Sequence, residues 1–76
     1  MGIRTVTERV VLWDSGLNQL ISKTEVTVEL VTNQGTVLFE QGPLYCSSAQ
    51  EILEASAILK DRLINSLPGL MKDEIS

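Results

Sequence analysis

Hydrophobic and polar residues alternate most regularly between positions 20 and 32. There Val26, Val28 and Leu30 fall on one face of an extended chain, and polar or charged residues fall on the other. A period of two is typical of a strand with one buried face. Residues 5–13 and 36–41 are also rich in Thr, Val and other strand formers. Three strands are therefore predicted, separated by glycine-containing turns, the last one ending at Gly42-Pro43.

The end of the first predicted strand is unusually apolar. Val10, Val11, Leu12 and Trp13 follow one another, so both faces of an extended chain are hydrophobic there. We expect this end of the strand to be covered on both sides.

A helix is predicted from about residue 49 to residue 67. Ser48 followed by Glu51 forms a capping box, in which each side chain accepts a hydrogen bond from a free backbone N–H. Pro68-Gly69 then ends the helix. At about 100° per residue, four residues fall together as the predicted core face, namely Ile52, Leu59, Leu63 and Leu67. Leu53, Ala57 and Ile64 form a second apolar strip beside that face.

The order of elements predicts an α+β fold: a three-stranded antiparallel β-meander followed by one C-terminal amphipathic α-helix packed on the sheet (β-β-β-α). We expect residues 1–69 to form a single small domain and residues 70–76 to form a partly ordered tail. At 76 residues, one core is marginally stable, and oligomerisation is a common remedy.

Composition disfavours several classes of function. The net charge is −4 and the six basic residues are scattered, which disfavours nucleic-acid binding. Because there is no histidine, Ser-His and Cys-His nucleophile pairs and Cys/His zinc sites are excluded. No cofactor or metal site is expected. The exception to a non-enzymatic interpretation is Cys46, which precedes the helix, although a small buried side chain is the simpler explanation.

The single cysteine and the lack of a long apolar segment lead us to expect a cytoplasmic protein without a membrane span. A viral or phage origin is compatible with so short a chain.

The apolar surface exceeds what one small core needs, which favours a non-enzymatic protein that binds other proteins stoichiometrically as a regulator, adaptor or inhibitor. It is expected to self-associate, most simply as a homodimer. The interface candidates are Trp13, Leu53, Ala57, Ile58 and Ile64. A broad core face with one exposed Ile58 is the plainer alternative for the helix. A different function, binding of a small molecule or anion between subunits, would use Arg4, Arg9 and Lys60.

Overall fold

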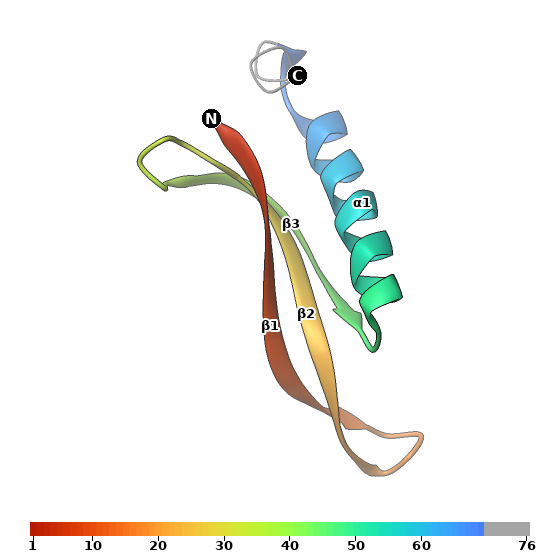
Figure 1. Cartoon of the computed structure of the whole chain (residues 1–76). Helices are drawn as coiled ribbons and strands as arrows, with labels where there is room; N and C mark the ends of the chain where they lie inside the picture. The colour runs from red at the N-terminus through yellow and green to blue at the C-terminus, as the bar shows by residue number, and fades with distance from the viewer. Residues whose placement is uncertain (70–76) are drawn as a thin grey trace.

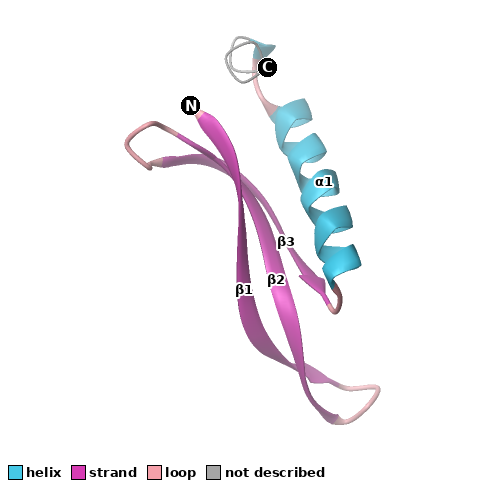
Figure 2. Ribbon diagram, in the orientation of Figure 1, coloured by secondary structure: helices cyan, strands magenta, loops and turns pink. Residues whose placement is uncertain are grey.

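The computed structural model describes residues 1–69 and contains one sheet and one helix. Strands β1 (Gly2–Asp14), β2 (Gln19–Val31) and β3 (Val37–Cys46) form an antiparallel sheet in the order β1-β2-β3. Helix α1 (Ala49–Ser66) crosses one face of this sheet and packs on β2 and β3 (Figure 1 and Figure 2). The predicted β-β-β-α fold is confirmed. The predicted tail at 70–76 lies outside the described residues.

The pairing of β1 with β2 is regular along its whole length. It runs from Gly2 opposite Val31 to Asp14 opposite Gln19 without a shift in register. Residues directly opposite each other in an antiparallel pair share a face. Trp13 therefore lies on the same face as Leu20, and Arg4 on the same face as Glu29.

Strand β3 does not end at Gly42-Pro43, so that prediction is wrong. Val26 pairs with Leu44, whereas Val28 pairs with Gln41, and one extra residue is therefore accommodated in β3 between these pairs. Gly42 has a φ of 114°, which a residue without a Cβ adopts readily, and the Gly42-Pro43 peptide is cis. The strand passes through this β-bulge and continues to Cys46.

Helix α1 begins with a cap that differs by one residue from the predicted capping box. The Ser48 hydroxyl accepts a hydrogen bond from the Glu51 N–H at 3.2 Å, as expected. The Glu51 carboxylate, however, accepts from the N–H of Ser47 at 2.8 Å, and not from that of Ser48. Both side chains still satisfy a backbone donor at the start of the helix, so the sequence signal identified the helix N-terminus correctly.

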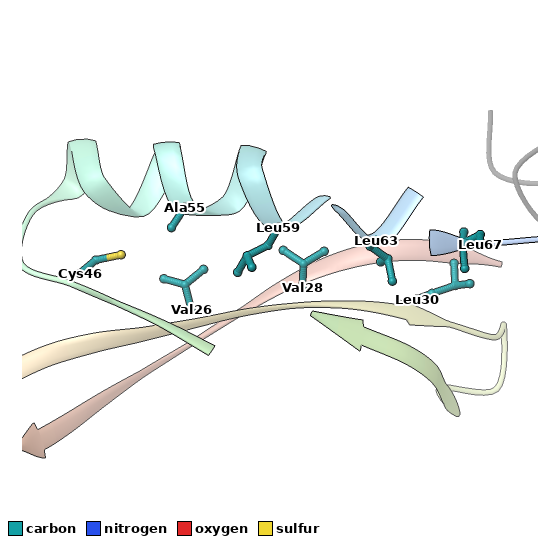
Figure 3. Packing of buried hydrophobic residues seen from close by; sticks show 8 residues of the cluster. All are labelled: Val26, Val28, Leu30, Cys46, Ala55, Leu59, Leu63 and Leu67. Carbon is teal, nitrogen blue, oxygen red and sulfur yellow. The ribbon is translucent and has the colours of Figure 1, made fainter. Parts of the chain in front are cut away.

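The core lies between α1 and the central strand (Figure 3). Val26, Val28 and Leu30 of β2 are fully buried, as their alternation predicted. Leu59, Leu63 and Leu67 face them from the helix, whereas Ile52 is only half-buried at the margin. Cys46 is buried, as its simpler explanation predicted, whereas Ala55 was not predicted as a core residue. The complete cluster is Val26, Val28, Leu30, Cys46, Ala55, Leu59, Leu63 and Leu67.

Candidate functional site: the hairpin arm

The β1–β2 hairpin extends beyond the rest of the fold. The last pair between β2 and β3 is Thr24 with Cys46, so residues 10–23 form a two-stranded projection, here called the hairpin arm. Five residues of β2, 19–23, extend beyond Thr24, a length of about 17 Å. Figure 1 shows this arm reaching past the start of α1.

The expectation that residues 10–13 are covered on both faces is wrong within the described chain. Helix α1 begins three residues after Cys46 and runs back along β2 and β3, away from the arm (Figure 1). The helix N-terminus is fixed by the end of β3, which is shorter than β1 and β2. No described element therefore lies over either face of the arm.

The arm carries most of the strongly exposed apolar surface. Among residues 1–69, five large apolar side chains are more than half exposed. Four of them belong to the arm: Val11 at 65%, Trp13 at 60%, Leu17 at 63% and Leu20 at 66%. The fifth is Leu53 at 68%. Single exposed apolar residues are ordinary, but such a concentration on one projection is typical of a contact surface.

Strand register groups three of these side chains on one face. Trp13 is directly opposite Leu20, and Val11 is two residues before Trp13 on the same side of the strand. On the other face of the arm, Leu12 is opposite Ile21, and both are half-buried. The arm is thus apolar on both faces. A hairpin that stayed in solvent would not need apolar side chains on either face.

The turn of the arm is held by its first residue. One carboxylate oxygen of Asp14 accepts hydrogen bonds from the N–H groups of Gly16 at 2.9 Å and Leu17 at 3.1 Å. Asn18 completes the turn in a left-handed conformation, with a φ of 52°. These contacts fix the backbone that presents Leu17 at the tip.

The helix contributes the remaining interface candidates. Leu53 and Ala57 are exposed, Ile64 is half-buried, and none of the three belongs to the core cluster. Ile58 is 47% exposed and lies about 120° around the helix from that strip. The five candidates predicted from sequence therefore lie in three places: Trp13 on the arm, the strip on one flank of α1, and Ile58 on the other.

The three cationic candidates do not form one site. Arg4 donates to Glu29 across β1 and β2, with a distance of 2.8 Å between its Nε and the carboxylate oxygen. Arg9 lies five residues along β1 and hence on the opposite face, and Lys60 is on the exposed surface of α1. No pocket is present within the part of the chain that the structure describes.

Cys46 has the surroundings of a core residue. It is 4% exposed and packs in the cluster beneath α1, and its Sγ lies 3.5 Å from the Glu51 carbonyl oxygen, to which the thiol donates. Within residues 1–69, no three His, Cys, Asp or Glu side chains are grouped as metal ligands. No helix among the described residues is both long and apolar enough to cross a membrane.

Sequence reasoning identified Trp13 but missed Leu17 and Leu20. The missing step was the hairpin register, because a turn that starts at Asp14 places Leu20 directly across from Trp13.

Comparison of the chain with known protein families, curated proteins and solved structures found no match. The site is therefore argued from its own geometry.

Proposed function

We propose that the protein is a non-enzymatic interaction protein that binds a target protein stoichiometrically through the hairpin arm. The observation that carries this proposal is the concentration of exposed apolar side chains on the arm, with Trp13 beside Leu20 at its centre. Tryptophan is enriched among residues that dominate binding energy when a partner buries them. A regulator, adaptor or inhibitor of another protein would act in this way.

The physical state of the arm supports a role in binding. An isolated two-stranded hairpin is marginally stable in water, and a third strand or a covering surface is usually needed. The arm has neither among the described residues, although both its faces carry apolar side chains. A target that covers the arm would stabilise it and bury its side chains in one step.

The energetics favour insertion of the arm into a groove over contact with a flat surface. Complete burial of a large apolar side chain contributes about 1.5–3 kcal/mol. Because Val11, Trp13, Leu17 and Leu20 are already about one third buried, their complete burial would together contribute about 4–8 kcal/mol, at the lower end of the cost of association. Burial of Leu12 and Ile21 on the other face provides the additional gain, and only a groove reaches both faces.

The chemistry of the chain supports a binding role over catalysis. Histidine is absent from the sequence, and Cys46 is enclosed in the core, where its thiol contacts a backbone carbonyl. The lone, buried thiol also supports our proposal that the protein acts in a reducing compartment such as the cytoplasm.

The experiment is an affinity capture from extracts of cells that produce the protein, with the intact chain as bait. Wild type is compared with Trp13→Ser and with Leu53→Ser, a control that removes an equally exposed apolar side chain from the helix. We expect one target protein in a fixed molar ratio with wild type and Leu53→Ser, and its loss with Trp13→Ser. A target lost only with Leu53→Ser, or no stoichiometric target at all, would contradict the proposal.

A further inference from the structure

The two edges of the sheet differ in how well they are protected from pairing with another strand. Strand β3 is interrupted by the bulge at Gly42-Pro43, and Pro43 lacks an N–H group to donate. Strand β1 has 13 residues, no proline and no register shift, and β2 pairs with only one of its sides. A long, regular edge strand of this kind is a template for another strand.

We infer that a second copy of the chain occupies this edge, with β1 pairing antiparallel to the partner's β1 about a two-fold axis at Val6. A two-fold axis perpendicular to an antiparallel pair places one residue opposite its own copy. With Val6 on the axis, Arg4 lies opposite the partner's Glu8, and Glu8 lies opposite the partner's Arg4. Each such pair of opposite charges is stabilising on a sheet surface.

The charges of β1 select this register among the alternatives. An axis at Arg4, Glu8 or Arg9 places two like charges directly opposite each other. An axis at Ile3, Thr5, Thr7, Val10 or Leu12 pairs no opposite charges, and an axis at Val11 places Glu8 opposite the partner's Asp14. Only the Val6 register combines opposite-charge pairs with the absence of like-charge pairs.

Within the subunit, Arg4 and Glu8 both remain able to form this ion pair. Arg4 uses its Nε on Glu29, its side chain is 52% exposed, and a guanidinium carries further donors for a second carboxylate. Glu8 lies directly opposite Glu25 in the β1–β2 pair, and like charges opposite each other destabilise a sheet. Among residues 1–69, no cation forms an ion pair with either of these two carboxylates. The partner's Arg4 would supply one to Glu8.

The resulting dimer leaves the hairpin arm available for the target protein. The overlap runs from Gly2, opposite the partner's Val10, to Val10, opposite the partner's Gly2. It ends where the arm begins, so the two arms project from opposite ends of a continuous six-stranded sheet. Both helices lie on the same face of that sheet, because a perpendicular two-fold axis does not exchange its faces. The dimer surface and the proposed target surface are therefore separate.

The first test measures the molar mass of the intact protein by light scattering coupled to size-exclusion chromatography. We expect twice the chain mass of 8.4 kDa at high concentration. Glu8→Arg is expected to raise the dimer dissociation constant at least about tenfold, because it faces the partner's Arg4 twice. The same change places opposite charges across from each other at residues 8 and 25, so the fold of the subunit should be retained. Adding Arg4→Glu to Glu8→Arg restores opposite charges across the interface and is expected to restore the dimer. Because Arg4→Glu also removes the ion pair with Glu29 within the subunit, circular dichroism is used to check that the double variant is folded.

The second test determines the register by disulfide cross-linking. Val6→Cys places two thiols across the axis and is expected to form a covalent dimer on mild oxidation. Val10→Cys, the same substitution on the same face of β1, is the control and is expected to remain uncross-linked. A monomeric wild type, or a dimer that neither responds to Glu8→Arg nor cross-links through Val6→Cys, overturns the inference. Trp13→Ser should leave the dimer intact. Loss of target binding in this variant therefore tests the proposed function separately from the dimer.

Discussion

Replacement of Gly42 by alanine tests the placement of the bulge that lets β3 reach Cys46. Gly42 has a φ of 114°, in the region that residues with a Cβ rarely adopt. A Cβ added there would lie 2.9 Å from the Val26 carbonyl oxygen and 3.3 Å from a methyl carbon of Leu59. The substitution therefore forces the chain into strain and into contact with the backbone of the central strand.

The expected cost follows from these two effects. A residue held in a sparsely populated backbone conformation costs about 1–3 kcal/mol. The contact with the Val26 carbonyl adds to it, because backbone in the middle of a sheet cannot move aside without disturbing its neighbours. We expect a loss of about 2–4 kcal/mol from a total stability of about 4–11 kcal/mol for a chain of this size. The melting temperature should fall by about 10–30 °C.

The assay is thermal and urea unfolding followed by far-ultraviolet circular dichroism at one fixed protein concentration. Two controls separate the two effects. Gly35→Ala has a φ of 88° but no atom within 4 Å of the added carbon, and Gly2→Ala has neither a left-handed φ nor a close neighbour. We expect losses in the order Gly2→Ala, Gly35→Ala, Gly42→Ala. If Gly42→Ala is no more destabilising than Gly35→Ala, the proposed contact with Val26 does not exist.

Three further predictions concern the core, the helix cap and the arm. Leu59→Ala should lower the free energy of unfolding, measured by chemical denaturation, by about 2–5 kcal/mol, because it opens a cavity in the core. Ile58→Ala, at the neighbouring exposed position, should lower it by well under half as much. Ser48→Ala should cost about 1 kcal/mol in the same measurement, because it removes the acceptor for the Glu51 N–H. Trp13→Ser should change the stability of the subunit by no more than about 0.5 kcal/mol while abolishing capture of the target, since the indole lies outside the core.

Sequence periodicity predicted the buried face of the central strand because that face is determined locally. Val26, Val28 and Leu30 alternate with polar residues, and a slip of one residue would expose all three. The continuation of β3 past Gly42-Pro43 was not predictable in the same way. Glycine and proline usually interrupt a strand, and here the bulge depends on how β3 meets β2.

The candidate site was predictable only in part, for a similar reason. Apolar positions on both faces of residues 10–13 were evident from the sequence, and Trp13 was identified as a contact residue. Whether anything covers them depends on where β3 ends and α1 begins, which is a property of the assembled sheet. The N-cap at Ser48 marked the start of the helix in the sequence. It did not indicate where the helix lies relative to the arm.

Trp13 is the only tryptophan, and its fluorescence tests the central claim most directly. The emission of the purified protein should resemble that of a tryptophan in water and should be readily quenched by acrylamide. Addition of the captured target should shift the emission to shorter wavelength and protect it from quenching, with saturation at a fixed molar ratio, because the indole enters an apolar groove. Emission and quenching that stay unchanged while the target binds would show that the hairpin arm is not the contact surface.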